Sequence, residues 1–347
     1  DVPIGVFLSG GIDSSLVTAL MARNSSQPIK TFTIGFRETA YNETEYAQKI
    51  ANLFHTNHTV LTVDPQSIDI LPQVVANYEE PYADSSAIVT YLVSRLARQQ
   101  VKVVINGDGG DENFAGYLRH IKLQRDYLLD GTKLFKPLAQ LMGYLSPRAK
   151  KFSLHQQLDI RFRYLNYNSF FPSPDNRTYD LWLEKCQESK AIDIRDQLLY
   201  VDLSYYFPDD LLAKVDISSM SVGLEARSPF TDHKVVELAA QIPYNLKVRH
   251  GQTKYILKKA AQSLLPDSIT SRPKMGFSIP LAQWFTGELN SYTRSQILNQ
   301  KSIVSQLFKK HTVKDMLNQH SVQTDFGPKL WSLLTLHLWW KYYFDSQ

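Results

Sequence analysis

The sequence predicts an α/β fold in which helices wrap a parallel sheet and a mainly helical region follows. In the first third of the chain, short apolar runs alternate with amphipathic helical patterns. Two of these runs end in glycine-rich turns, at residues 8–11 and 106–110. Beyond Tyr117 the strand signals fade and helical spacing prevails. Proteins of this class bind ligands beyond the carboxyl ends of the strands, where both turns fall.

The individual elements follow from hydrophobic period and from the Gly and Pro residues that bound each run. The first strand is expected at 2–6, and its turn leads into a helix at 14–23 with Leu16, Val17 and Leu20 on one face. Further strands are expected at 30–36, 59–63 and 101–105, with helices between them at 43–54, 67–78 and 85–99. Later helical patterns cover 119–129, 195–207, 233–241, 252–264, 303–319 and 329–344, whereas 130–175 gives no clear pattern.

Composition narrows the class of protein. The 347 residues are 43% apolar and 12% aromatic, as in ordinary globular proteins. A net charge of +4 with scattered Lys and Arg indicates neither a nucleic-acid surface nor a membrane-binding tail. The single cysteine, Cys186, excludes an internal disulfide framework, and the longest apolar stretch, 331–344, is too short to span a bilayer. We therefore expect a cytoplasmic protein, and the start at Asp1 in place of Met predicts a fragment or a processed chain.

The first glycine turn has the features of a phosphate site. Residues 7–15 read Phe-Leu-Ser-Gly-Gly-Ile-Asp-Ser-Ser, so a strand, a glycine turn and a helix start follow one another. The free amides at the positive end of such a helix suit phosphate. The spacing is neither that of the P-loop nor that of the dinucleotide fingerprint. Ser-Gly-Gly-x-Asp-Ser resembles the pyrophosphate loop of enzymes that cleave ATP between its α and β phosphates.

The second glycine turn, residues 106–117, has three glycines in its first five residues and is acidic. Its carboxylates, Asp108, Asp111 and Glu112, would repel a triphosphate unless Mg²⁺ bridged them, and Asp13 from the first turn is a further candidate ligand. The alternative is that Asp13 caps a helix and that Asp108 and Asp111 are ordinary turn residues. The occurrence of both turns, in order on one sheet, favours a nucleotide site.

Two later blocks complete the pattern. Residues 219–230 contain Gly-Leu-Glu-Ala-Arg-Ser-Pro-Phe, and residues 272–277 read Arg-Pro-Lys-Met-Gly-Phe. With the two turns, these blocks resemble the synthetase domain of glutamine-dependent asparagine synthetases, whose scaffold β-lactam synthetases share. The resemblance covers nearly the whole chain and is weakest at 130–195. It implies a parallel five-stranded sheet and one domain over 1–347, with a nucleotide-binding α/β core in 1–120 and a mostly helical part in 121–347 that completes the substrate pocket.

The resemblance also implies roles at matching positions. The β and γ phosphates would be held by Ser9, Gly10, Gly11, Ser14 and Ser15. Adenosine would be contacted, largely through the backbone, at Leu8, Ile34 and Gly107. Magnesium would be bound by Asp13 and Asp111. Asn106 departs from the usual Ser at its nucleotide-binding position, and Asn113 and Ala115 depart from an apolar residue and a Gly.

Catalytic and substrate-binding roles are implied in the same way. Asp108 holds the acidic position linked to the acyl-adenylate, and Lys274 matches a lysine near the α-phosphate. Glu225 and Arg227 would belong to the amino-acid pocket. The alternatives are a structural ion pair for Glu225 and Arg227 and an ordinary surface position for Lys274. For Lys214 and Asp216 the alternative is a solvated helix face.

The implied reaction is amidation of aspartate with ATP and ammonia through β-aspartyl-AMP, releasing AMP and pyrophosphate. Relatives obtain the ammonia from an N-terminal glutaminase domain whose nucleophile is a first-residue cysteine. Residue 1 here is Asp, so we expect no glutaminase activity in this chain and such a domain upstream of it in a longer protein. A homodimer is compatible with the pattern, and neither a nucleic acid nor a membrane is an expected partner. The alternatives are a relative that amidates or cyclises another carboxylate, and a nucleotide-binding remnant without catalysis.

Overall fold

The computed structural model describes residues 1–347 except 133–134, 143, 170–175, 277–278 and 346–347. The chain divides into two compact units and passes between them several times. The first unit consists of Asp1–Gly107, Asp210–Pro229 and Leu264–Gln347, and the second of Asp108–Asp209 and Phe230–Ser263. None of the helices in the described part of the chain combines the length and the apolar character that crossing a bilayer requires.

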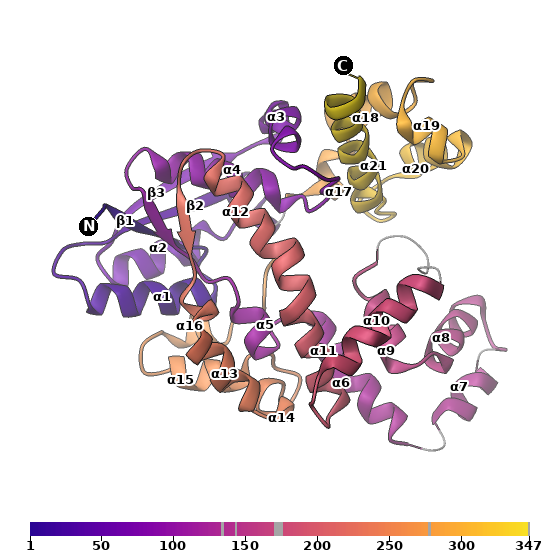
Figure 1. Ribbon diagram of the computed structural model, residues 1–347, viewed down its shortest axis with the longest axis horizontal. Helices are drawn as coiled ribbons and strands as arrows, with labels where there is room; N and C mark the ends of the chain where they lie inside the picture. The colour runs from indigo at the N-terminus through magenta and orange to yellow at the C-terminus, as the bar shows by residue number, and fades with distance from the viewer. Residues whose placement is uncertain (133–134, 143, 170–175, 277–278, 346–347) are drawn as a thin grey trace. The chain divides into compact units, whose positions relative to one another are not determined.

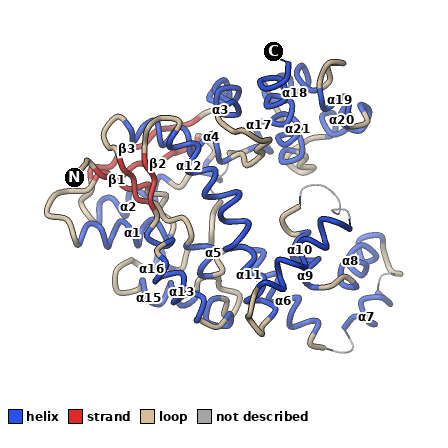
Figure 2. Tube along the Cα trace, in the orientation of Figure 1, coloured by secondary structure: helices blue, strands red, loops and turns tan. Residues whose placement is uncertain are grey.

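The first unit is built on a parallel sheet (Figures 1 and 2). Its strands are β1 (Ile4–Phe7), β2 (Lys30–Phe36), β3 (Asn57–Val63), β4 (Val103–Ile105) and β5 (Glu225–Arg227), in the spatial order β3-β2-β1-β4-β5. Gly5 of β1 is the register partner of Lys30 in β2 and of Val104 in β4. The predicted five-stranded parallel sheet is therefore confirmed. The strand order reverses between β1 and β4, and such a switch point is where α/β sheets bind ligands.

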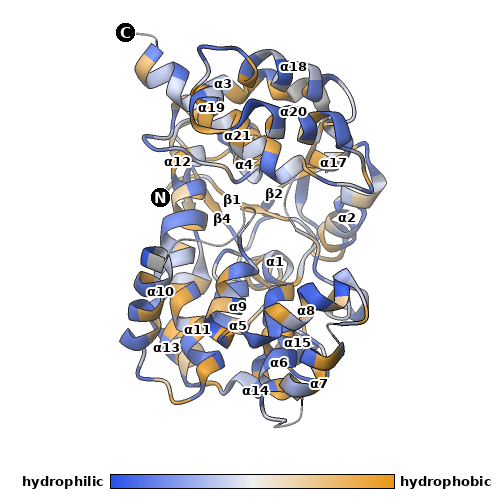
Figure 3. Ribbon diagram, turned by 90° about the vertical axis from the view of Figure 1, so that its right-hand side faces the viewer, coloured by the Kyte–Doolittle hydropathy of each residue, from blue (hydrophilic) through white to orange (hydrophobic). Residues whose placement is uncertain are grey.

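Helices cover both faces of this sheet, α1 (Ile12–Arg23) and α2 (Thr44–Leu53) on one and α4 (Ser86–Arg98) and α12 (Ala213–Met220) on the other (Figures 1 and 3). The α4 helix is almost wholly buried, from Ser86 through Ser94, because it packs between the sheet and α12. A short helix, α3 (Leu71–Ala76), adds Leu71 and Val74 to the same core.

The C-terminal part of the first unit is helical. Its elements are α16 (Asp267–Thr270), α17 (Leu281–Trp284), α18 (Glu288–Ile297), α19 (Ile303–Leu307), α20 (Lys310–Gln319) and α21 (Gly327–Trp340). The helix predicted at 303–319 is thus divided into α19 and α20. Leu330, Trp331 and Leu334 of α21 are buried among the surrounding helices and join the core that includes α3 and α4.

The second unit is helical, and its helices carry polar and apolar residues side by side (Figure 3). They are α5 (Gly110–Phe114), α6 (Leu118–Asp130), α7 (Phe135–Met142), α8 (Pro147–Gln157), α9 (Ile160–Asn166), α10 (Asn176–Glu188), α11 (Ile194–Val201), α13 (His233–Gln241), α14 (Tyr244–Lys247) and α15 (Tyr255–Ala261). The helix predicted at 195–207 is α11, which continues as wider π-helical turns over Asp202–Leu212. Pro208 lies within those turns.

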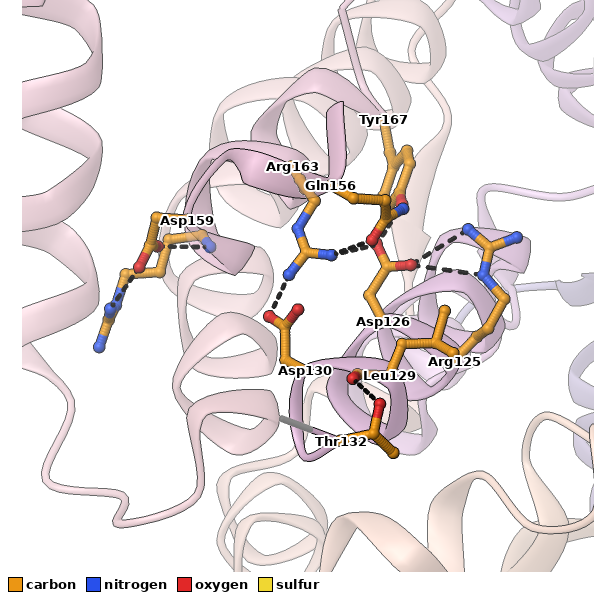
Figure 4. A network of polar contacts seen from close by, with 10 residues as sticks. Arg125, Asp126, Leu129, Asp130, Thr132, Gln156, Asp159, Arg163 and Tyr167 are labelled. Carbon is orange, nitrogen blue, oxygen red and sulfur yellow. Dashed lines mark hydrogen bonds and ion pairs between the residues drawn. The ribbon is translucent and has the colours of Figure 1, made fainter. Parts of the chain in front are cut away.

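A buried polar network joins α6, which was predicted, to α8 and α9, which lie in the stretch that the sequence leaves unassigned (Figure 4). The Arg163 guanidinium is fully buried, donates to Gln156 Oε1 at 2.7 Å, and pairs with Asp126 at 3.7 Å and with Asp130. Tyr167 donates its hydroxyl proton to Asp126. These contacts balance the buried charge, so a polar network stabilises this part of the unit beside the apolar contacts of Leu123 and Tyr164.

Candidate functional site

The first glycine turn, residues 8–11, is held in shape by its own serines. The backbone N–H of Ser9 donates to Ser14 Oγ at 3.2 Å, and the two hydroxyl oxygens lie 3.1 Å apart. The N–H of Gly11 donates to Ser9 Oγ at 3.2 Å, and Ser14 Oγ donates to the Gly11 carbonyl at 3.3 Å. Gly11 is the N-cap of the 12-residue helix α1, so Asp13 lies in its first turn and the alternative of Asp13 as the cap is wrong. The turn presents the positive end of a helix, as phosphate binding requires.

The position of Gly10 has no room for a side chain. Its φ is +75°, and a Cβ there would lie 2.6 Å from the backbone nitrogen of Ala47 and from Tyr46 Cβ. The turn therefore approaches the first turns of α2 as closely as backbone atoms allow. Beneath it, the Ser15 hydroxyl is fully buried and has no hydrogen-bond partner among the described residues.

The two glycine turns meet inside the first unit. A Cβ on Gly107 would lie 2.8 Å from Asp13 Cβ and 2.9 Å from the backbone nitrogen of Ser14. The buried Asn106 donates its backbone N–H to the Arg227 carbonyl at 2.9 Å, so β5 fixes the start of the second turn. Because β1 and β4 are neighbours, their carboxyl ends bring Asp13, Ser14 and Gly107 together at the switch point of the sheet.

The two apolar positions expected to border adenosine are buried beside the first turn. Leu8 is 1% exposed and Ile34 is 3% exposed. The Leu8 N–H donates to the Phe32 carbonyl at 2.9 Å, and its carbonyl accepts the Thr33 hydroxyl. Both the N–H and the carbonyl of Leu8 are therefore hydrogen-bonded to β2.

The remainder of the second turn belongs to the second unit, which contains Asp108 and Asp111. The Asp111 carboxylate pairs with the Lys254 ammonium at 2.7 Å, and both side chains are largely buried. Gly116 allows this pair, because a Cβ there would overlap Asp111 Oδ1 and Lys254 Cε. Asn113 donates from Nδ2 to the Phe230 carbonyl at 2.8 Å, so the unusual Asn at this position stabilises the turn.

A magnesium site made by the protein alone does not occur within the described ranges, where no group of three or more His, Cys, Asp or Glu side chains could hold a metal ion. Mg²⁺ in nucleotide sites commonly uses one or two carboxylates and completes its octahedron with phosphate oxygens and water. Asp13, in the first turn of α1, is a carboxylate of that kind, and its chemistry fits a metal delivered with the nucleotide. In the second unit, the Asp111 carboxylate is of the same kind but already has the Lys254 ammonium as a partner.

Three further predicted residues lie on the surface of the first unit. The Lys274 side chain is exposed. Glu225 and Arg227 form an ion pair at 2.7 Å on β5, with side chains 51% and 65% exposed. The pair expected as the structural alternative is therefore present, and its exposure leaves both groups accessible to a ligand.

One buried pair was not anticipated from the sequence. Lys214 is 8% exposed, and its ammonium lies 2.8 Å from the Asp84 carboxylate. Burial acts to raise the pKa of Asp84, but the Lys214 ammonium and hydrogen bonds from Ser86 outweigh it and lower that pKa. The expectation of a solvated helix face is wrong for Lys214, whereas Asp216 is exposed. A lysine in an amphipathic helix gives no sequence signal of a partner 130 positions away.

Comparisons with known proteins agree with this geometry. A family model described as asparagine synthase matches residues 1–341. Asparagine synthetase [glutamine-hydrolyzing] 1 of Bacillus subtilis is 30% identical over 356 residues, which cover 98% of this chain and 56% of that protein. Asparagine synthetase [glutamine-hydrolyzing] 3 of the same organism is 25% identical over 369 residues, covering 99% and 57%. The amidase chyE of Penicillium rubens is 24% identical over 358 residues, covering 88% and 53%. The chain thus spans about half the length of the curated relatives it matches.

Proposed function

The chain belongs to the asparagine synthase family, and from this premise we propose that it is the synthetase part of an ATP-dependent amidating ligase. In the proposed reaction the β-carboxylate of aspartate attacks the α-phosphorus of ATP and expels pyrophosphate. Ammonia then attacks the resulting β-aspartyl-AMP and releases AMP, with loss of one proton, to give asparagine. The C–N bond forms as the bond between the acyl carbon and the phosphate oxygen breaks.

The contact between the two glycine turns carries the proposal. Gly107 lies against Asp13 and Ser14 at the switch point of the sheet, beside the positive end of α1. Such an arrangement supports binding of an anion with several charges, and the Ser9–Ser14 hydrogen bonds preorganise it. The apolar residues Leu8 and Ile34, both buried in this unit, are the positions we propose for the adenine contact.

The roles we propose follow from charge. The α1 amides with Ser9, Ser14 and Ser15 bind the departing pyrophosphate. Asp13 and Asp111 hold Mg²⁺, which neutralises phosphate charge when bound. The Lys274 ammonium stabilises the negative charge that develops at the α-phosphate. Asp108 acts at the acyl-adenylate, and the exposed Glu225–Arg227 pair recognises the amino acid.

The source of ammonia is part of the proposal. Cys186 is buried, and burial raises the pKa of its thiol to about 11, which leaves it a poor nucleophile. We propose that this chain uses free ammonia and that a glutaminase domain supplies it in the longer protein.

Pyrophosphate release tests the function. With aspartate, Mg-ATP and ammonium the chain is expected to form asparagine, AMP and pyrophosphate in equal amounts, whereas glutamine in place of ammonium gives no asparagine. Asp13→Ala is expected to lower the rate about 100-fold through loss of metal and phosphate binding, and Asp216→Ala, on the exposed face of α12, serves as its control. Formation of ADP in place of AMP, or release of glutamate from glutamine, contradicts the proposal. Pyrophosphate release with another carboxylic acid but not with aspartate identifies the alternative acceptor.

A further inference from the structure

Arg272 links the segment that carries Lys274 to the first glycine turn. One guanidinium nitrogen donates to Glu43 Oε1 at 2.7 Å, and the other donates to the carbonyl of Gly10 at 3.3 Å. The guanidinium plane also lies 3.9 Å from the centre of the Tyr46 ring. All of these residues belong to the first unit, and the amino-acid sequence separates Arg272 from Gly10 by 262 positions.

The junction is buried and its charges are balanced. The Arg272 and Glu43 side chains are 7% and 11% exposed. Burial removes the hydration of a guanidinium, and this cost is offset only where hydrogen bonds and an opposite charge replace the water. Ion pair, carbonyl contact and cation–π contact together fix the side chain in one orientation. Pro273 follows directly and restricts the backbone between Arg272 and the exposed Lys274.

We propose that Arg272 is a positioning residue which, held by Glu43 and Tyr46, anchors the 272–276 segment on Gly10 so that the Lys274 ammonium faces bound phosphate. This inference rests on the proposed function for the role of Lys274, but the anchor itself rests on the contacts alone. Arg272 acts through Lys274 and not by touching substrate, because its side chain is buried and two of its N–H groups are directed at Glu43 and Gly10.

A double-mutant comparison tests the coupling. Arg272→Gln is expected to lower kcat for pyrophosphate release about 10- to 100-fold with a smaller change in the KM for ATP. If Arg272 acts through Lys274, the double variant Arg272→Gln with Lys274→Ala loses no more activity than Lys274→Ala alone. Effects that multiply in the double variant, or a kcat unchanged in Arg272→Gln, overturn the proposal. Arg294→Gln is the matched control, since the side-chain hydrogen bond described for Arg294 of α18 goes to the exposed Asn318 and not to the first glycine turn.

Limited proteolysis tests the anchor without any activity. Trypsin does not cleave before proline, so within 272–276 it cuts only after Lys274. Arg272→Gln and Glu43→Gln are each expected to speed cleavage after Lys274 about tenfold, whereas Arg294→Gln leaves it unchanged. Faster cleavage in a chain that makes no pyrophosphate rejects the proposed function and supports the anchor. An unchanged cleavage rate after Lys274 in both variants overturns the anchor whatever the activity.

Discussion

Gly116 lies beside both members of the Asp111–Lys254 ion pair, at the end of the second glycine turn. A methyl group at this position would occupy the space of Asp111 Oδ1 and Lys254 Cε. The two side chains would have to separate, and each buried charge would lose its partner. Sequence reasoning assigned Asp111 to magnesium but gave no sign of Lys254, because no local pattern connects residues 111 and 254.

Gly116→Ala is therefore expected to reduce the free energy of unfolding by about 3 kcal/mol, the cost of breaking a buried ion pair. Urea unfolding of the two proteins measures the difference. Gly131→Ala is the control in the same unit, because Gly131 has helical backbone angles and a Cβ there meets its nearest neighbour at 3.4 Å. Equal destabilisation by the two substitutions would show that the Asp111–Lys254 geometry is unimportant.

Comparison of the predicted helices and strands with those of the structure shows which elements are determined by the local sequence pattern. Strands β1 to β4 were predicted because β-branched and apolar runs end at Gly or polar turns. The three-residue β5 was missed, because Glu225 and Arg227 are exposed and only pairing with β4 makes the segment a strand. In α1 the expected face was partly wrong: Leu20 is 46% exposed, while Ser14 and Thr18 are buried. Small residues are needed on this face of α1 because Gly107 lies against Ser14 and the Thr18 hydroxyl donates to the Ser14 carbonyl.

The Lys214–Asp84 pair fixes α12 to the start of α4, since Asp84 also accepts the Ser86 N–H at 2.8 Å. Lys214→Met is expected to lower the free energy of unfolding by about 3 kcal/mol, because it leaves the Asp84 carboxylate largely buried without its ammonium. Adding Asp84→Asn removes that charge and recovers part of the loss. Chemical unfolding of the single and double variants measures both values.

The control for this prediction is Lys185→Met, which removes an ammonium paired with Glu188 on the protein surface. Solvent screens that pair, so the substitution is expected to leave the unfolding free energy nearly unchanged. A double variant that is less stable than Lys214→Met would contradict the assignment of the loss to an uncompensated Asp84 charge.

At the scale of the whole molecule, sequence predicted the sheet and the family better than the assembly of the chain. The sheet and its two glycine turns could be predicted because their signals are local and ordered along the chain. The division into two units, between which the chain crosses four times, could not, because it depends on packing between distant segments. The Arg272–Glu43 junction was missed for the same reason, since its partners are 229 positions apart.

The free energy of unfolding depends on pH through buried groups whose contributions have opposite signs. Burial lowers the pKa of His58, His120, His155 and His337, so each takes up a proton on unfolding below about pH 6.5. Their contribution to stability is present above that pH and is lost as the pH falls. Glu43 acts in the opposite direction. Burial, opposed by Arg272 and Lys274, raises its pKa to about 7, so its contribution is present below the ordinary glutamate pKa of 4.5 and is lost as the pH rises through 7.

Between about pH 5 and pH 6.5 the histidines therefore gain protons on unfolding while Glu43 releases one. Over this range folded Glu43 is protonated and hydrogen-bonded to Arg272, and the two side chains form an ion pair once the pH exceeds about 7. Glu43→Gln removes the proton release that opposes proton uptake by the histidines. The free energy of unfolding is therefore expected to rise with pH more steeply than in the parent chain, by about 1.4 kcal/mol per pH unit. Urea unfolding at several pH values gives the slope. Glu45→Gln, an exposed position in the same helix turn, is expected to keep the parent slope. An unchanged or shallower slope in Glu43→Gln would mean that Glu43 is already ionised over this range, with the Arg272 attraction exceeding the cost of burial.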